Sequence, residues 1–415
     1  MSNVGVNLKE LRNLSLEGAL FLFFSFFVFF QCISIAVANT FLGLSVFVAI
    51  LIVIKNFKTP SNSELFKNIF DSRYWLGLFS VFWLSMFLSG FFSYESIEGL
   101  KKAFNWYVYR TAPFFIILFF FRDSRKSTFF IWLALISCVL DIIVGLFLAP
   151  EGSTRLKGIF GHPMTLAGFI SISMPILCSY LFDWKQKKSA LLLSSVLFFI
   201  FLMGLLLNGT RGAWLAVAPA ILLIGFCFSI KSWKKLVFLS FICASTIVIF
   251  CSNQRFEERA LSIASTTLQS NTERLCMWQS AWNMFKDNPI VGVGVGQYAH
   301  KYQNEYILPQ AKERKQNHAH SNIFQMLGQS GAVGLFGFLT LFLGIFWFGF
   351  KTVRKDESPY GIMILACSLS FFIQGLTEFN FGNSAVLKYY LVVLGCFVIL
   401  SSQKEMLNLC VFPRR

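Results

Sequence analysis

The sequence predicts an all-α polytopic integral membrane protein, and three observations support this fold class. Of its 415 residues, 56% are hydrophobic and only 13% are charged, whereas soluble domains carry about 25% charged residues. The mean hydropathy is +0.63. Apolar runs of roughly 20 residues recur along the whole chain, and each is long enough to cross about 30 Å of hydrocarbon as a helix.

Breaks between these runs predict about twelve transmembrane helices. The first run is long and lacks a small-residue cleavage site, so we expect it to be retained as a span. We expect nine helices in residues 1–251, a large loop at 252–320, and three helices with a cytoplasmic tail in 321–415. The expected spans lie near residues 17–35, 38–54, 74–92, 103–121, 128–149, 163–182, 189–207, 212–230, 236–251, 321–350, 360–378 and 385–402.

The distribution of lysine and arginine predicts the orientation of the chain. If the amino terminus is cytoplasmic, the inner loops are rich in these residues and the short outer loops are poor in them, as the positive-inside rule requires. Most of the net charge of +16 is then a topology signal. Anionic membrane lipid is therefore favoured over nucleic acid as its partner. The inner cations are Lys55, Lys58, Lys67, Arg73, Arg122, Arg125, Lys126, Lys185, Lys187, Lys188, Lys231, Lys234, Lys235, Lys351, Arg354 and Lys355.

The loop at 252–320 faces the outer side in this orientation and is the expected functional region. Structureless loops above about 15 residues are uncommon unless they are functional. A short amphipathic helix opened by Arg274 is expected over 272–285, close to the membrane surface. Its apolar residues are spaced as on one helical face, and they are Leu275, Trp278, Trp282 and Phe285.

Three glycines follow this helix, namely Gly292, Gly294 and Gly296. A GxGxG string can indicate a dinucleotide site, but no βαβ unit surrounds this one. We therefore expect a flexible or tightly turned backbone here and no nucleotide cofactor.

Three charged residues are expected at or inside the membrane edge. Arg211 follows a tight outer turn, where it either snorkels to lipid headgroups or binds phosphate through its planar, always-charged fork. Arg110 and Asp141 lie roughly 10–12 Å deep in the fourth and fifth spans. They either pair across adjacent antiparallel helices or line a substrate cavity.

Two of the four histidines, His318 and His320, stand at the mouth of the tenth span. Histidine exchanges protons near neutral pH, so the pair indicates a catalytic site. A polar helix cap is the alternative reading of His320. A zinc site is a further alternative, but no clear third ligand is spaced nearby.

At these residues the chain resembles the O-antigen ligases, within a wider superfamily of O-antigen ligases and polymerases. The pattern is histidine, then Asn, Ser or Gln, nine residues, glycine, two residues, and Gly, Thr or Tyr. Here it is formed by His320, Ser321, Gly331 and Gly334. The resemblance extends to Thr210-Arg211-Gly212, Arg274-Leu275 with Trp278, Asn288-Pro289 with Gly292-Val293-Gly294, and Gly158-Ile159-Phe160-Gly161-His162-Pro163.

The resemblance implies a glycosyltransferase on the periplasmic side of the bacterial inner membrane. Such ligases move O-antigen polysaccharide from undecaprenyl pyrophosphate to the lipid A-core in lipopolysaccharide biosynthesis, with inversion and without metal or nucleotide. His320 matches the family position of the general base, whereas His318 would point elsewhere on a helix. Arg211 and Arg274 match positions that can neutralise the leaving pyrophosphate.

Other functions remain open from the sequence. An O-antigen polymerase or a protein O-oligosaccharyltransferase of the same superfamily would share the arginines and the histidine. A transporter of lipid-linked glycans is the alternative from a different functional class. The one-sided loop, the few membrane-embedded charges and the lack of an evident repeat argue against transport. The acceptor sugar cannot be read from the sequence.

Overall fold

The computed structural model describes residues 15–57, 63–148, 155–182, 188–229, 232–252, 254–263, 265, 268–356 and 359–403. Within these ranges every regular element is a helix, which confirms the predicted all-α class. Nine of the described helices are long and apolar enough to cross a membrane. They are α3 (Ile35–Asn56), α5 (Arg73–Phe91), α8 (Ser124–Phe147), α9 (Pro163–Phe182), α10 (Lys188–Asn208), α11 (Arg211–Ser229), α16 (Asn322–Asp356), α17 (Pro359–Thr377) and α18 (Ser384–Ser402).

Three of the expected spans have a different form. The first corresponds to α2 (Leu16–Phe30), which has 15 residues. The ninth corresponds to α12 (Trp233–Ser252), which is not one of the nine helices named above. The fourth is broken into four consecutive pieces: α6 (Ser96–Ala103), the π-helical turn η2 (Phe104–Val108), the 3-10 turn η3 (Tyr109–Thr111) and α7 (Ala112–Phe120).

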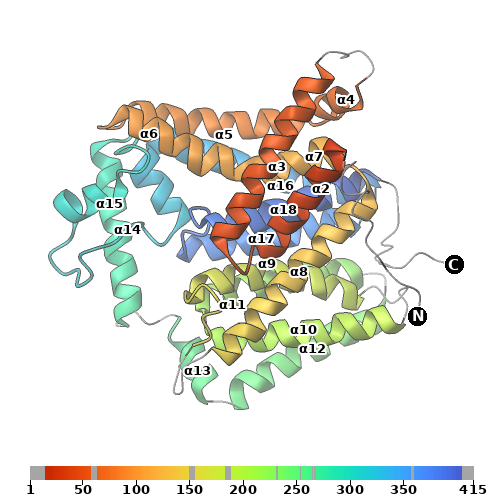
Figure 1. Cartoon of the computed structure of the whole chain (residues 1–415). Coiled ribbons are helices and arrows are strands. Elements are labelled where there is room, and N and C mark those ends of the chain that lie inside the picture. Colours follow the sequence, from red (N-terminus) through yellow and green to blue (C-terminus); the bar gives the residue numbers. More distant parts are fainter. Residues whose placement is uncertain are drawn as a thin grey trace.

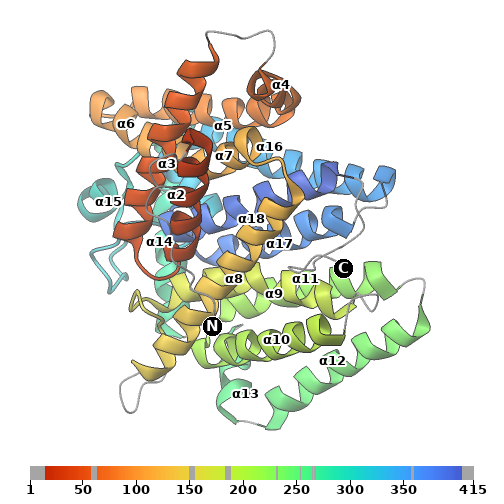
Figure 2. The ribbon, with the colours of Figure 1, turned by 45° about the vertical axis from the view of Figure 1, so that its right-hand side comes forward.

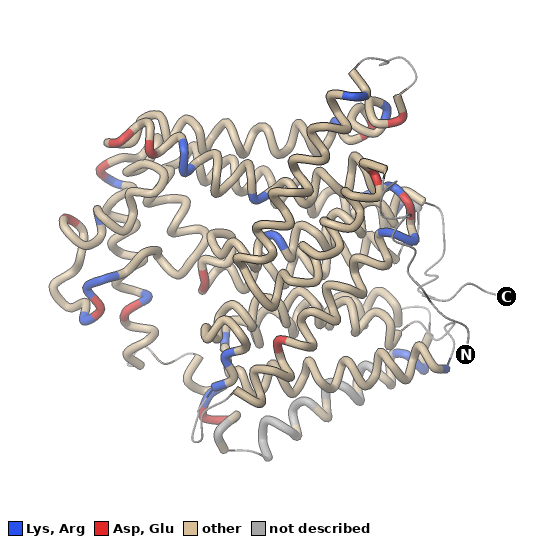
Figure 3. Tube along the Cα trace, in the orientation of Figure 1, with Lys and Arg blue, Asp and Glu red and all other residues tan. Residues whose placement is uncertain are grey.

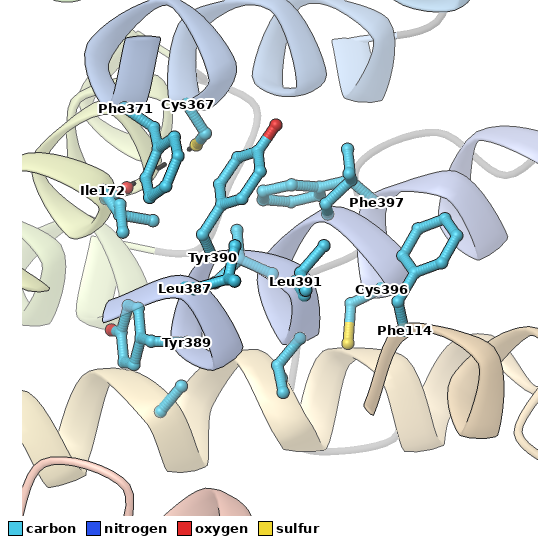
Figure 4. Close-up of a cluster of buried hydrophobic side chains, with 14 of the residues drawn as sticks. Phe114, Ile172, Cys367, Phe371, Leu387, Tyr389, Tyr390, Leu391, Cys396 and Phe397 are labelled. Atoms are coloured by element: carbon cyan, nitrogen blue, oxygen red, sulfur yellow. Dashed lines mark hydrogen bonds between the residues drawn. The ribbon is translucent and has the colours of Figure 1, made fainter. Parts of the chain in front are cut away.

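The centre of the bundle is tightly packed around α9 and α18. The apolar window of α9 is 100% buried and that of α18 is 94% buried. Figure 2 shows these helices and α17 between a group containing α3 and α5 and a group containing α10 and α12. Tyr390 of α18 stacks on Phe371 of α17 with ring centroids 4.3 Å apart, and Cys367 of α17 donates to the Ile172 carbonyl of α9 (Figure 4). Such packing leaves the helix ends and the loop to build a polar site.

The loop expected at 252–320 is largely helical in its described part. Figure 1 shows α14 and α15 at the left-hand end of the bundle, away from α4 (Glu64–Asp71), and Figure 3 shows charged residues gathered toward these two ends. Both pictures place the loop helices on one end of the apolar bundle. The loop elements are α13 (Gln254–Leu261), α14 (Gln269–Asp287), α15 (Tyr298–Lys301) and the π-helical turn η4 (Tyr302–Tyr306).

The amphipathic helix predicted in the loop is present as α14, but it is longer than expected. It begins at Gln269, so Arg274 lies in its second turn and does not open it. The helix packs along α16, where Trp278 stacks on Phe324 with ring centroids 5.0 Å apart. Trp282, one turn further along the helix, is 42% exposed.

A kink in α16 joins this helix to the glycine-rich segment of the loop. Gly331 has φ 61° and ψ −160°, and a Cβ there would lie 2.5 Å from the backbone of Ile290. Both the left-handed conformation and the close approach therefore require glycine. The Val333 N–H donates to the Ile290 carbonyl at 3.0 Å, and the Gly294 N–H donates to the Gln329 carbonyl at 2.9 Å. Of the two forms expected for the loop glycines, flexible or tightly turned, the structure shows the turned one, with positive φ at Gly292, Gly294 and Gly296.

Candidate functional site

Glu378, in the turn between α17 and α18, stands at the centre of the candidate site. Its Oε2 lies 3.2 Å from His320 Nδ1 and 3.8 Å from Arg274 Nη2. Two side chains predicted from the sequence therefore meet at a carboxylate that sequence reasoning missed. Glu378 is the only acidic residue in 359–403, and this isolation between two apolar runs is the signal that could have found it.

The backbone holds the histidine in a sparsely populated conformation. His320 has φ 48° and is the only non-glycine residue with positive φ in the described part of the chain. Such outliers persist when their surroundings over-determine them, and they cluster at functional sites. The His320 N–H donates to His318 Nδ1 at 3.2 Å. Just after it, Asn322 donates to Asn380 Oδ1 at 2.8 Å and accepts from the Phe381 N–H at 3.2 Å. These bonds tie the start of α16 to the turn that carries the carboxylate.

The charge on Glu378 determines the tautomer of His320. Burial alone would raise the pKa of the Glu378 carboxyl, but the hydrogen bond and charge of His320, together with His318 and Arg274, lower it below its usual value. The carboxylate is therefore ionised and can only accept, so His320 Nδ1 carries the proton and Nε2 remains an acceptor. The His320 side chain is 22% exposed, which leaves it accessible to a substrate.

His318 lies beside His320, with ring centroids 4.2 Å apart. The prediction that His318 points elsewhere is wrong, because the residues before Asn322 are not helical. Burial first, and the neighbouring His320 next, lower the pKa of His318 to about 4. Its Nδ1 already accepts the His320 N–H, so its Nε2 carries the proton. His318 is thus a neutral hydrogen-bond donor and a poor base.

Four arginines from separate segments line a cavity of about 200 Å³, and Glu378 is the only acidic residue among the lining residues. The fold thus adds two arginines that sequence reasoning did not select as site residues. Burial, followed by the charges of the other three arginines, lowers the pKa of Arg155 to about 10. Positive charges held this close together favour an anionic ligand. The four are Arg155, Arg211, Arg259 and Arg274.

Neutral oxygen atoms hold Arg211 in place. Its guanidinium donates to the Ser262 carbonyl at 2.6 Å, to Ser270 Oγ at 2.9 Å and to Asn271 Oδ1 at 2.7 Å. Each of these acceptors is uncharged, so the guanidinium keeps its net charge for a ligand. The bonds also show that Arg211 fastens the loop to α11.

An apolar groove extends from the arginines. A cavity of about 220 Å³ shares Arg211 and Arg274 with the arginine cavity of about 200 Å³. Its other lining residues are uncharged. Two of these, Leu215 and Leu275, are 45% and 48% exposed. The groove therefore runs from a cationic pocket toward an apolar outer surface, an arrangement that suits an anion carrying a hydrocarbon chain.

A larger cavity of about 510 Å³ is also lined by Glu378, which the arginine cavity and this cavity share. His318 and His162 face the larger cavity, and Arg110 lines it from the broken fourth span. The carboxylate thus stands between a cationic pocket and a roomier polar one. Two ligands can therefore lie close to Glu378, one in each cavity.

Arg110 and Asp141 do not pair, so that sequence-derived alternative is wrong. Arg110 donates to the Gly382 carbonyl at 2.7 Å. Asp141 instead accepts the Ile159 N–H at 2.6 Å, and Gly158, with φ 67°, brings its backbone against the carboxylate. Asp141 therefore shapes the segment that precedes α9, whereas Arg110 takes the cavity position that was the other alternative.

His318, His320 and Glu378 each offer one donor atom, and these atoms lie within 4.8 Å of one another. Two imidazoles and a carboxylate suit zinc. The sequence showed no third ligand, because Glu378 is brought to the histidines only by folding. A cation here would compete with Arg274 for Glu378 and would face the charge of the arginine cluster. The charge balance therefore favours proton transfer over metal binding.

The fold and the site together define a multi-pass helical membrane protein with an anion pocket and a histidine–glutamate pair at one end of its bundle. A family model described as O-antigen ligase matches residues 196–339. This match supports the O-antigen ligase and polymerase superfamily that the motifs predict. The matched range contains Arg211, Arg274 and His320, whereas Glu378 lies beyond it. Comparison with curated proteins gives no match.

We expect His318→Gln to make the folded protein less sensitive to acid. The pKa of His318 is lowered from 6.5 to about 4 in the native state, so between these values the unfolded chain binds a proton that the native chain does not. Because only the unfolded chain gains this proton, the free energy of unfolding decreases as the pH falls from 6.5 toward about 4. Thermal unfolding is measured at about pH 7.5 and about pH 5. The decrease in Tm between these two pH values should be about 2–4 °C smaller for His318→Gln than for the unaltered protein.

The matched control for this measurement is His300→Gln, since His300 is an exposed histidine of the same loop. It should behave like the unaltered protein. An equal fall in Tm for His318→Gln and the unaltered protein would mean that His318 protonates freely in the native state.

Proposed function

We propose that this protein is an O-antigen ligase, which transfers polysaccharide from undecaprenyl pyrophosphate to the lipid A-core on the periplasmic side of the bacterial inner membrane. The observation that carries the proposal is the meeting of a histidine base and an arginine pocket at Glu378. A lipid-linked sugar diphosphate is already activated, so the reaction needs neither nucleotide nor redox chemistry.

The donor end of the site is the arginine cavity with its apolar groove. The diphosphate would lie among Arg155, Arg211, Arg259 and Arg274, where planar guanidinium groups match phosphate oxygens. The prenyl chain would leave along the groove toward Leu215 and Leu275. Charge that develops on the departing diphosphate is stabilised there by donors that are already in position.

The chemistry follows from the protonation of the histidine pair. The acceptor hydroxyl attacks the anomeric carbon of the donor sugar while its proton passes to His320 Nε2. The bond from the anomeric carbon to the diphosphate oxygen breaks, and undecaprenyl diphosphate leaves with the electron pair. Glu378 stabilises the imidazolium that forms through the bond to Nδ1. His318 is too weak a base for this role and instead offers an N–H to the sugars.

Transport of lipid-linked glycans fits the structure less well. Alternating access needs a site near the middle of the bundle that opens to both faces. Here the middle is filled by α9 and α18, and the two cavities that Glu378 lines lie beside the loop helices. A polymerase of the same superfamily would use the same donor chemistry, so the acceptor has to be found by experiment.

We expect deletion of the gene to separate ligase from polymerase. Loss of a ligase should leave lipid A-core without O-antigen while polymerised glycan accumulates on undecaprenyl pyrophosphate. Lipopolysaccharide from the deletion strain can be analysed by gel electrophoresis together with the lipid-linked pool. Lipopolysaccharide that carries a single repeat would instead identify a polymerase and contradict the ligase proposal.

Arg211→Ala and Arg274→Ala should each nearly abolish transfer, and lysine at either position should rescue poorly, because the bidentate fork is lost while the charge remains. Transfer from purified lipid-linked donor measures the effect. Arg314→Ala is the matched control, an exposed arginine of the same loop.

Asn271→Ala separates phosphate binding from loop attachment, since it removes one loop contact of Arg211 and leaves the guanidinium in place. It should retain most of the activity. Full activity of both Arg211→Lys and Arg274→Lys would remove the assigned diphosphate contact.

His320→Ala should fold and insert, bind the lipid-linked donor, and lose about 10²–10⁴ in transfer rate, as expected for a positioned general base. His318→Ala should be milder. Glu378→Gln should slow transfer and shift its pH profile, because the imidazolium loses its charged partner. Glu305→Gln, which changes an exposed acid on the loop, is the control.

Near-normal transfer by purified His320→Ala would remove the base assignment. Activity should also survive EDTA. Inhibition that one added metal reverses would assign the two histidines and Glu378 to a metal site.

A further inference from the structure

The larger cavity contains a cation that the donor site does not use. Arg110 lines this cavity, and its guanidinium carbon lies 5.8 Å from the centre of the Trp106 ring, which lines the same cavity. Both residues belong to the short π-helical and 3-10 turns that break the fourth span. Such breaks in a helix are frequent at functional sites. Here the break brings an aromatic face and a cation to one wall.

The charge of Arg110 has no carboxylate partner among the described residues. Its hydrogen bond is to the Gly382 carbonyl at 2.7 Å, and Asp141 is engaged by the Ile159 N–H. A second cation increases the imbalance: Lys388 lies close enough to interact with Arg110 electrostatically, and its Nζ donates to the neutral Asn39 Oδ1 at 2.5 Å. A cation removed from bulk water is stabilised by an opposite charge. Glu378, the carboxylate that lines this cavity, is held by His320 and Arg274, so the charge of Arg110 favours an anionic group in the ligand.

The position of the cavity identifies the ligand. In an inverting displacement the attacking hydroxyl and the leaving diphosphate stand on opposite sides of the anomeric carbon. Glu378 lines both the arginine cavity and the larger cavity. If the diphosphate occupies the first, the acceptor sugar occupies the second, beside His318.

We propose that the larger cavity binds the acceptor sugar and that Arg110 selects an acceptor with an anionic substituent, a phosphate or a carboxylate, close to the reactive hydroxyl. The proposal rests on the proposed glycan transfer and adds the chemical class of the acceptor. Trp106 supplies a flat apolar surface for a sugar ring. The amide side chains of Gln325, Gln329 and Asn383 make the same walls polar.

The test measures binding of acceptor glycan to the full-length protein in nanodiscs, without donor. Three probes are prepared from the host core oligosaccharide: the untreated glycan, the glycan dephosphorylated with hydrogen fluoride, and the glycan with its carboxyl groups reduced. Calorimetry compares their Kd values. One of the two treatments should weaken binding about tenfold or more, as expected for the loss of a charge-assisted contact. The treatment that does so identifies the anion.

Arg110→Gln should bind the untreated glycan as weakly as the unaltered protein binds the glycan whose anionic group has been removed. Trp106→Ala should weaken all three probes by a similar factor, because stacking does not depend on the substituent. The matched control is Arg122→Gln. Arg122 lines another cavity and pairs with Asp71, and its loss should leave all three Kd values unchanged.

Equal binding of the three glycans to the unaltered protein would overturn the inference, and this comparison requires no variant to fold. Retention of the anion preference by Arg110→Gln would overturn it as well. Acceptor binding is measured without donor, whereas the proposed function is measured by transfer. A negative result for the inference can therefore be told apart from a negative result for the proposed function. Binding that depends on Arg110 in a protein that transfers nothing would contradict the proposed function alone.

Discussion

The site depends on the contact between His320 Nδ1 and Glu378 Oε2, because this contact determines the protonation state of both side chains. The carboxylate stays ionised beside a histidine and an arginine, and the imidazole keeps its proton on the buried nitrogen. That leaves the other nitrogen free to accept a proton from a substrate. The contact depends on two chain segments that meet only in the folded bundle, the start of α16 and the turn after α17. Side-chain amides of Asn322 and Asn380 fasten these segments together.

The apolar environment explains why the polar parts lie at one end. Backbone groups in hydrocarbon must be satisfied inside the protein, so the long helices supply packing and the loop supplies chemistry. The exceptions are the places where a span is interrupted. At Gly331 the loop backbone takes over the hydrogen bonds of the kinked helix. In the fourth span the interruption brings Arg110 and Trp106 to a cavity. Irregular backbone in a span is tolerated where it lines a cavity, and here it does.

The sequence predicted the helical class, the amphipathic loop helix and the importance of His320, Arg211 and Arg274, since hydropathy, periodicity and motif spacing are local properties. It could not predict Glu378, whose role depends on a contact across 58 residues. The two additional arginines of the donor pocket became visible for the same reason. Pairing of Arg110 with Asp141 was a reasonable inference from depth alone. It is wrong because the break in the fourth span directs Arg110 to the cavity and the carboxylate caps a backbone N–H. Depth in a membrane does not specify the direction of a side chain.

The two cavities that Glu378 lines suggest how one superfamily can serve different acceptors. Ligases and polymerases both consume a lipid-linked sugar diphosphate, so both need an arginine pocket, a groove for the lipid and a base at the boundary. They differ in the hydroxyl that attacks. We therefore expect the residues that separate the two activities to line the larger cavity, such as Trp106, Arg110 and Asn317. The arginines and His320 would be common to both. This division accounts for why the motifs identify the superfamily but not the acceptor: the motif arginines Arg211 and Arg274 line the donor cavity.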